Sequence, residues 1–232
     1  METLVACGSN ALPDQTLTNN RDISNDGTPP IAAATSEKII KPIEVITNQS
    51  RLTSYANGQM NLTITSSPYA ICNFIVSYGM NMPSRAFGIK PVTADAYGLA
   101  SWQWQVEGKA PTGNWPLKIT ATSVNGAQTS RTINVIVTLP PINLDSTTST
   151  LSVARKAEAT LAVLTAPFVS CTMTMDYTSK SKTLKGRADS KGEMSWTWKV
   201  EAGTGPGIYP LIVAITTGSG EQEKVTFDIT IK

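Results

Sequence analysis

The sequence contains no histidine, and this absence excludes several kinds of chemistry from a chain of 232 residues. Zinc sites with imidazole ligands, Ser-His-Asp triads and Cys-His dyads all need that side chain. The 3 cysteines, Cys7, Cys72 and Cys171, are too scattered to form a metal-binding cluster. We therefore expect no metal, no other cofactor and no catalytic residue, so the chain is predicted not to be an enzyme.

Charge and long apolar runs are also scarce. Only 16% of the residues are charged and the formal net charge is +2, a positive field too weak to indicate nucleic-acid binding. No apolar run reaches the ~18 residues that a membrane-spanning helix needs. Hydrophobic residues make up 41% of the chain, which is enough for the cores of one large domain or two domains of about 100 residues.

The segment Leu4–Ser9 reads LVACGS, in which Leu, an aliphatic residue and Ala precede Cys7. This pattern resembles the lipobox of bacterial lipoproteins and implies that Cys7 is the acylated residue. Only Met-Glu-Thr stands where a basic region and an apolar stretch are expected. A trimmed signal, a start codon placed late and a chance match all stay open.

Residues 8–35 are rich in Asn, Asp, Thr, Ser and Pro and show neither helical nor strand periodicity. Such a segment buries too little apolar surface to offset the entropy lost on ordering. We predict a disordered, flexible tether that, together with the lipobox remnant, covers residues 1–40. An ordinary disordered terminus without a lipid is the alternative.

The remaining sequence is a tandem repeat. Trp102 recurs 94 residues later as Trp196, whereas Cys72 recurs 99 residues later as Cys171. The first copy therefore carries five extra residues between Tyr78 and Asp95, in a loop of the kind where duplicated domains diverge. The predicted organisation is a first domain at 41–138, a Pro-containing linker at 139–144 and a second domain at 145–232.

Short alternating segments separated by turn residues indicate about seven strands in each copy of about 90 residues, which favours an immunoglobulin-like or fibronectin-like β-sandwich. The predicted fold class is all-β, with two tandem sandwiches behind the tail. In the first copy we expect strands near 43–48, 59–66, 70–78, 86–91, 99–106, 114–124 and 130–138.

Each copy contains a Trp-x-Trp pair, SWQWQV at Ser101–Val106 and SWTWKV at Ser195–Val200. The pair could be an aromatic platform for sugars or part of a domain core. Strand side chains alternate faces, so the two Trp residues share one face and polar residues occupy the other. We predict that Trp102, Trp104, Trp196 and Trp198 point into the cores.

The same alternation places Cys72 and Cys171 on apolar faces, where each is expected to behave as a small buried hydrophobe. One cysteine per domain cannot form an intradomain disulfide. A bridge between two separate cores is sterically implausible, because the two Cα atoms must come within ~7 Å.

The second copy gathers basic residues in the run SKSKTLKGR, at Lys180, Lys182, Lys185 and Arg187. We expect these residues on one solvated loop. Contact with an anionic polymer or with lipid headgroups is the alternative, and it would be sensitive to salt. Asp95 and Asp189 precede glycines in Ala-Asp-x-x-Gly and are expected to make turns rather than a calcium site.

Together these motifs resemble a bacterial Ig-like module found in secreted and lipid-anchored proteins of Gram-positive bacteria and Chloroflexi. The resemblance implies an extracytoplasmic spacer or adhesion role, and it covers nearly all of the chain after residue 45. The matching residues of the first copy are Pro68, Cys72, Tyr78, Asp95, Gly98, Trp102, Trp104, Gly113, Trp115 and Pro116; those of the second are Pro167, Cys171, Tyr177, Asp189, Gly192, Trp196, Trp198, Gly207, Tyr209 and Pro210.

The leading hypothesis is a non-enzymatic protein at the cell surface or secreted, which forms a stalk, an adhesive unit or part of a surface structure. One alternative is a module that binds a glycan or another cell-envelope polymer through loop residues. Another is a filament subunit that self-associates when the N-terminal tail of one copy adds a strand to the next. A surface protein is a further candidate partner. We expect contact with the membrane only through a lipid anchor.

Overall fold

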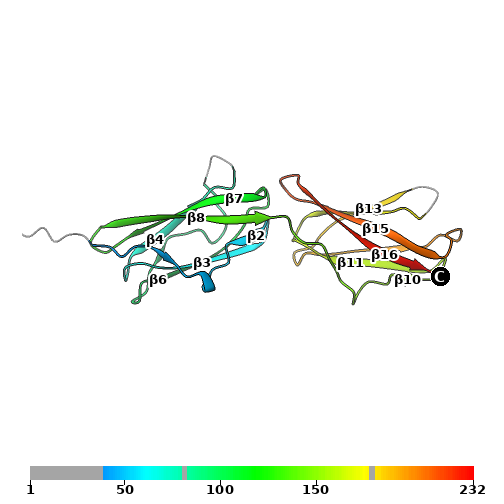
Figure 1. The fold of residues 1–232 in the computed structure, drawn as a ribbon, viewed down its shortest axis with the longest axis horizontal. Helices are drawn as coiled ribbons and strands as arrows, with labels where there is room; N and C mark the ends of the chain where they lie inside the picture. The colour runs from blue at the N-terminus through cyan, green and yellow to red at the C-terminus, as the bar shows by residue number, and fades with distance from the viewer. Residues whose placement is uncertain (1–38, 80–82, 178–180) are drawn as a thin grey trace, which may run out of the picture. The chain divides into compact units, whose positions relative to one another are not determined.

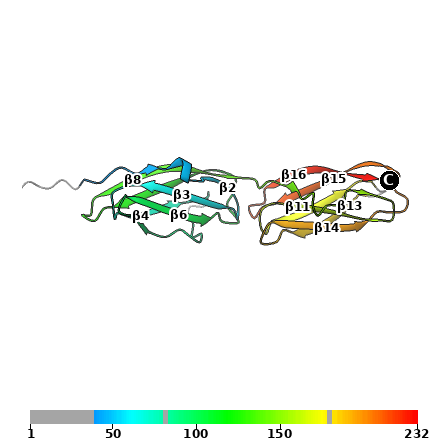
Figure 2. The same ribbon diagram turned by 90° about the horizontal axis from the view of Figure 1, so that it is seen from below.

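The computed structural model describes residues 39–79, 83–177 and 181–232. Within them the chain is all-β apart from one 3-10 turn at Thr47–Gln49. Two sheets face each other in each of two β-sandwiches (Figure 1, Figure 2). The predicted fold class of two tandem sandwiches is confirmed. Cys7 and the predicted tether up to residue 38 lie outside the described residues.

The first sandwich packs a three-stranded sheet of order β1-β3-β6 against a five-stranded sheet of order β2-β8-β7-β4-β5. All strand pairs are antiparallel except β2 with β8, which is parallel. The strands are β1 (Glu44–Val45), β2 (Thr53–Tyr55), β3 (Gln59–Thr65), β4 (Ile71–Val76), β5 (Val92–Thr93), β6 (Leu99–Gln105), β7 (Gly113–Thr122) and β8 (Gln128–Thr138).

The second sandwich repeats this topology, with sheets of order β14-β11-β9 and β10-β16-β15-β12-β13. Its one parallel pair is β10 with β16, at the same place as in the first sandwich. The strands are β9 (Asn143–Leu144), β10 (Ser152–Val153), β11 (Glu158–Leu164), β12 (Ser170–Met175), β13 (Lys182–Arg187), β14 (Glu193–Lys199), β15 (Gly207–Thr216) and β16 (Gln222–Ile231).

Each sandwich has its own hydrophobic core. Buried residues from Ile43 to Val137 form one cluster, and buried residues from Ile142 to Ile231 form the other. β9, at the end of the predicted linker 139–144, already pairs with β11 of the second sandwich. The predicted domain boundaries stay predictions: the first cluster ends before that segment, and the second begins within it, at Ile142.

The two copies differ at the fifth strand of the larger sheet. In the second sandwich β13 pairs with β12 over six residues, whereas β5 pairs with β4 over only two. The strand expected at residues 86–91 is therefore wrong, because this segment turns toward the smaller sheet, where Phe87 accepts a hydrogen bond from the backbone N–H of Gln105. The five extra residues of the first copy fall in this region. The sequence patterns also missed β2.

Candidate functional site

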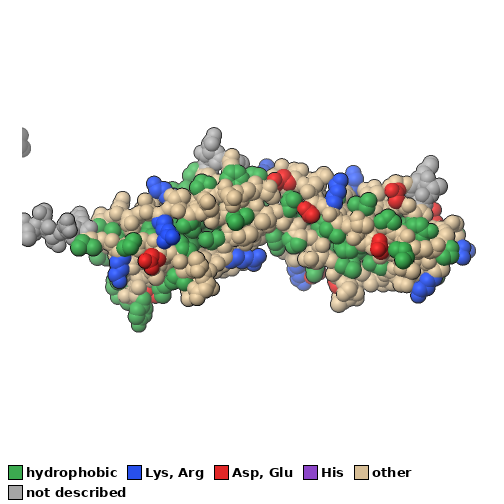
Figure 3. Space-filling model, viewed as in Figure 1, with side chains coloured by type: hydrophobic (Ala, Val, Ile, Leu, Met, Phe, Trp, Pro, Cys, Tyr) green, Lys and Arg blue, Asp and Glu red, His purple; other side chains and the backbone are tan. Residues whose placement is uncertain are grey.

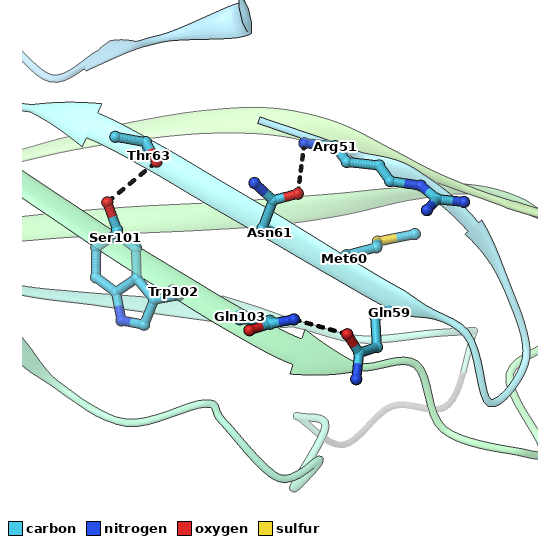
Figure 4. Close-up of a pocket in the computed structure, with 8 residues that line it drawn as sticks. All are labelled: Arg51, Gln59, Met60, Asn61, Thr63, Ser101, Trp102 and Gln103. Atoms are coloured by element: carbon cyan, nitrogen blue, oxygen red, sulfur yellow. Dashed lines mark hydrogen bonds between the residues drawn. The ribbon is translucent and has the colours of Figure 1, made fainter. Parts of the chain in front are cut away.

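A polar hollow of about 490 Å³ lies on the smaller sheet of the first sandwich (Figure 4). Alternate residues of the neighbouring strands β3 and β6 face the same side, which brings their polar side chains together. The lining residues are Arg51, Gln59, Met60, Asn61, Thr63, Ser101, Trp102 and Gln103.

Several polar groups of the hollow bond to one another, and others bond to the neighbouring backbone carbonyls of Gln49 and Thr53. Gln103 Nε2 donates to Gln59 Oε1 at 2.6 Å, and the hydroxyls of Thr63 and Ser101 are 3.0 Å apart (Figure 4). Asn61 Oδ1 accepts from the backbone N–H of Arg51 at 3.1 Å. The hollow therefore offers amide, hydroxyl and guanidinium groups suited to a hydroxyl-rich ligand. The side chains that line it include no carboxylate or thiol, so they supply no acid–base pair.

A second hollow, of about 260 Å³, brings the carboxylates Asp145, Asp189 and Glu193 to one surface of the second sandwich. Asp145 accepts hydrogen bonds from the hydroxyls of Thr147 and Thr148, and these bonds lower its pKa. Among the described residues, no three His, Cys, Asp or Glu side chains converge as metal ligands do.

The Trp-x-Trp side chains lie in the cores, each no more than 5% exposed. Trp104 Nε1 donates to the hydroxyl of Tyr78 at 2.9 Å, and Trp198 makes the matching bond to Tyr177. Burial raises the pKa of both tyrosines, while the bond from each indole works in the opposite direction. Each pair thus joins two buried polar groups, as a core requires, and neither side chain is offered to a ligand.

The first Trp of each pair, Trp102 or Trp196, differs between the copies in its hydrogen bonding. Trp102 Nε1 donates to the backbone carbonyl of Lys90 at 2.8 Å. Its counterpart Trp196 Nε1 is buried and has no hydrogen-bond partner among the residues that the structure describes. The displaced segment 86–91 of the first copy supplies the carbonyl, and the regular strand β13 of the second copy does not.

Cys72 and Cys171 are buried and form no disulfide. Each Sγ lies 3.6 Å from the backbone carbonyl two residues earlier, that of Ala70 or Val169. Burial raises the pKa of both thiols, so few thiolates are present at neutral pH and neither cysteine is set up as a nucleophile.

The basic run of the second copy lies on a strand where a loop was expected. Lys182, Lys185 and Arg187 belong to β13, the edge strand of the larger sheet, and Lys180 lies outside the described residues. Lys185 and Arg187 share one face of the strand, whereas Lys182 is on the other. Arg187 Nε donates to the carbonyl of Phe168 at 2.9 Å, and its guanidinium carbon lies 5.5 Å from that ring. The three basic side chains therefore do not form a single cationic surface on β13.

Asp95 and Asp189 close matching turns. Asp189 Oδ1 accepts from the N–H groups of Lys191 and Glu193, both at 2.8 Å, and Asp95 does the same for Tyr97 and Leu99. These backbone bonds, with the charge of Lys191, lower the pKa of Asp189.

The glycine of each of these turns has little room for a side chain. Gly98 and Gly192 have φ of +82° and +85°. A Cβ at either position would lie 2.1 Å from a backbone carbonyl oxygen, that of Ser66 or Thr165.

Trp115 and Tyr209, at matching positions of the two copies, form equivalent hydrogen bonds to the backbone. Trp115 Nε1 donates to the carbonyl of Pro111 at 3.0 Å, and the hydroxyl of Tyr209 donates to that of Gly205 at 3.0 Å. In both copies an aromatic residue at the start of the long hairpin strand is tied to the chain four residues earlier. The motif Gly-x-Trp/Tyr-Pro, at Gly113–Pro116 and Gly207–Pro210, therefore holds the start of this strand against the preceding loop.

The sequence patterns did not single out Arg51, Asn61 or the acidic turn at Asp145. The alternation in SWQWQV placed Gln103 on the outer face, but the facing residues of β3 become neighbours only through the β3–β6 register. Within the described residues, no helix is long and apolar enough to cross a membrane.

Comparisons with known proteins find similar solved structures but no sequence family. No family model and no curated protein matches the sequence. Among solved structures, the chain is similar to a tetra-tandem repeat in the extending region of a large adhesion protein, with 16% identity over 83% of this chain and 49% of that chain and a TM-score of 0.36.

Two other structures match at similar levels. For E. coli alpha-2-macroglobulin the identity is 13% over 82% of this chain and 14% of that chain, with a TM-score of 0.33. For the Yersinia pseudotuberculosis adhesin InvE it is 17% over 80% of this chain and 60% of that chain, with a TM-score of 0.28. The chain thus spans less than two thirds of the length of each of these neighbours.

Proposed function

We propose that the chain is a non-enzymatic, extracytoplasmic surface protein whose two Ig-like domains serve as a stalk or adhesion module. One observation carries this proposal: most of the motif residues that the two copies share are buried or hold turns, whereas most of the exposed residues differ. Trp104 and Trp198 are buried in the same way, and Asp95 and Asp189 close the same turn. In the hollow, by contrast, Asn61 and Gln103 correspond to Thr160 and Thr197.

A duplication that retains the core and varies the surface is what a spacer requires, since its shape matters more than any one site. The pattern LVACGS supports a lipid anchor on Cys7, followed by a tether of polar residues. The resemblance to the Ig-like modules of Gram-positive bacteria and Chloroflexi points to the same setting.

The first experiment is the mass of the N-terminal peptide of the protein purified from its native membrane fraction. The proposal expects Cys7 to be the first residue and to carry acyl chains. A peptide that begins at Met1 with a free thiol would refute the lipid anchor. Intact cells treated with a protease should then show whether the two domains are exposed on the outside.

Binding of a glycan is a second candidate function, favoured by the hydrogen-bonding groups of the hollow on β3 and β6. It predicts saturable retention of the full chain on an envelope polysaccharide. Asn61→Ala with Gln103→Ala should then abolish retention, because both side chains line the hollow. The matched control is Thr160→Ala with Thr197→Ala, at the corresponding positions of the second sandwich, and it should retain binding. Equal retention by both variants would exclude the hollow.

A further inference from the structure

One end of the first sandwich carries a cluster of exposed hydrophobic side chains, which we call the apolar tip. Figure 3 shows hydrophobic side chains at the end of this sandwich where the described chain begins. Exposure ranges from 57% for Tyr69 to 83% for Tyr97. The members of the apolar tip are Ile39, Tyr69, Ile71, Tyr97 and Val124.

Hydrogen bonds and strand pairing bring these residues to one end. The loop that contains Tyr69 is tied to the next loop by its own N–H, which donates to the carbonyl of Asp95 at 3.3 Å. The first described segment joins the same loop, because the N–H of Lys41 donates to Ser67 Oγ at 2.9 Å. Ile71 pairs with Thr122, so the hairpin that contains Val124 lies beside it.

The backbone at Tyr69 has a φ of +59°. An aromatic residue rarely adopts this left-handed conformation, and here the side chain is held outward with more than half of its surface exposed. Phe168, at the same position of the second sandwich, has a φ of +61°, so this conformation belongs to the repeated turn. What is particular to the first sandwich is the set of other exposed hydrophobic side chains in the apolar tip.

The second sandwich provides an internal comparison. Its residues at the positions of Tyr69, Ile71, Tyr97 and Val124 are Phe168, Ser170, Lys191 and Gly218. Only Phe168 is a large hydrophobic residue, and the guanidinium of Arg187 lies over its ring. The apolar tip is therefore a property of the first sandwich and not of the repeated fold.

We propose that the apolar tip rests in the headgroup region of the lipid bilayer that holds the anchor. This inference rests on the proposed acylation of Cys7. The described chain begins at Ile39, within the tip, so the tip is the part of the fold nearest in sequence to Cys7. Tyrosine rings and short aliphatic side chains suit the boundary between headgroups and acyl chains.

The charges near the tip do not oppose this contact. The Asp95 carboxylate accepts hydrogen bonds from the backbone N–H groups of Tyr97 and Leu99 and is held within its turn. Lys41 lies next to the tip and is exposed, where it can meet a phosphate group. Apolar burial drives the contact, and its dependence on salt is expected to be weak.

The test uses the full chain with Cys7→Ser, which removes acyl attachment and leaves the tip to act alone. Flotation with phosphatidylcholine–phosphatidylglycerol vesicles gives its partition coefficient. Adding Tyr69→Asn, Tyr97→Ser and Val124→Ser should lower partition about tenfold, the change that ~1.4 kcal/mol produces. The matched control Phe168→Asn, at the position of Tyr69 in the second sandwich, should leave it unchanged.

Several outcomes would overturn the inference. One is a Cys7→Ser chain that stays off vesicles at every lipid concentration, and another is a tip variant that partitions as its parent does. A molecular mass that rises with concentration, and does so only with the tip intact, would assign the tip to contact between copies. An unchanged urea midpoint shows that the variant is folded. The N-terminal peptide mass tests acylation separately, so an acylated chain with an inert tip refutes this inference alone.

Discussion

The indole N–H groups of the Trp pairs show how the two copies have diverged. The second Trp of each pair, Trp104 or Trp198, donates to a tyrosine hydroxyl. Of the first two, Trp102 has an acceptor, and Trp196 has none within the described part of the chain. The alternation of strand faces predicted that all four point inward. It could not predict their partners. The bond to Tyr78 depends on how the two sheets pack, and Lys90 lies in the region where the five extra residues fall.

At the residue scale, Trp102→Phe should destabilise its sandwich more than Trp196→Phe destabilises the other. Both changes remove the same volume, but only the first breaks a hydrogen bond. We expect a difference of about 1 kcal/mol in the free energy of unfolding, measured by urea titration of the full chain. Trp104→Phe and Trp198→Phe are the controls and should match each other. Equal losses for Trp102→Phe and Trp196→Phe would contradict the prediction.

The carboxylate of Asp189 gives a prediction about pH. Its pKa is lowered in the folded state by backbone hydrogen bonds, so it stabilises the fold fully above the ordinary carboxyl pKa of about 4. That contribution is lost as the pH falls through the lowered folded value. Asp189→Asn keeps the acceptor oxygen and removes the charge.

Asp189→Asn should therefore lower stability at neutral pH and flatten the acid limb of a plot of unfolding midpoint against pH. Asp228→Asn, at an exposed position on β16, is the control and should leave the acid limb as steep as in the parent chain. A variant of Asp189 with the parent's acid limb would show that the turn gains nothing from ionisation.

At the scale of elements, the sequence predicted the regular strands well and the irregular ones poorly. Alternation is clear in β6, β7 and β8, which are long and have one buried face. β2 and β5 have three and two residues, too few for a periodic pattern to form. The sequence predicts a loop for the basic run because Lys-rich segments are normally solvated, yet an edge strand is solvated as well.

The basic residues of β13 lie on a strand at the edge of its sheet, where we expect them to oppose pairing with another chain. A sheet edge has unpaired backbone groups that can pair with another chain, and Lys side chains oppose this. Lys182→Thr with Lys185→Thr should therefore cause association that grows with protein concentration, detectable by light scattering. The control is Lys118→Thr with Lys232→Thr, where Lys118 lies on β7 between two paired strands. A monodisperse β13 variant would show that the charges have another role.

At the scale of the whole molecule, two cores of the same design each enclose one thiol. The 94- and 99-residue spacings predicted the duplication, because a repeated core must repeat its buried side chains in order. The hollow on β3 and β6 and the apolar tip were not foreseen. Both depend on which loops and strand faces meet in space, and no single segment of the sequence contains that information.

The two thiols can report on the two sandwiches separately. With Cys7→Ser in place, neither Cys72 nor Cys171 should react with a thiol reagent at neutral pH, since burial raises both pKa values. In urea, each should react as its own core opens. Trp102→Phe should lower the urea concentration at which Cys72 reacts and leave that of Cys171 unchanged. A common shift of both would show that the sandwiches unfold as one unit.

The parallel pairs β2–β8 and β10–β16 have a mechanical consequence. In each, a strand near the start of the domain runs alongside the last strand in the same direction. Tension applied to the two ends of a domain pulls these strands past each other along their length. Bonds such as Ile136 N–H to Leu52 O and Thr230 N–H to Leu151 O then share the load and must break together. A protein tethered at one end and pulled at the other would resist extension until the hydrogen bonds of the parallel strand pair break.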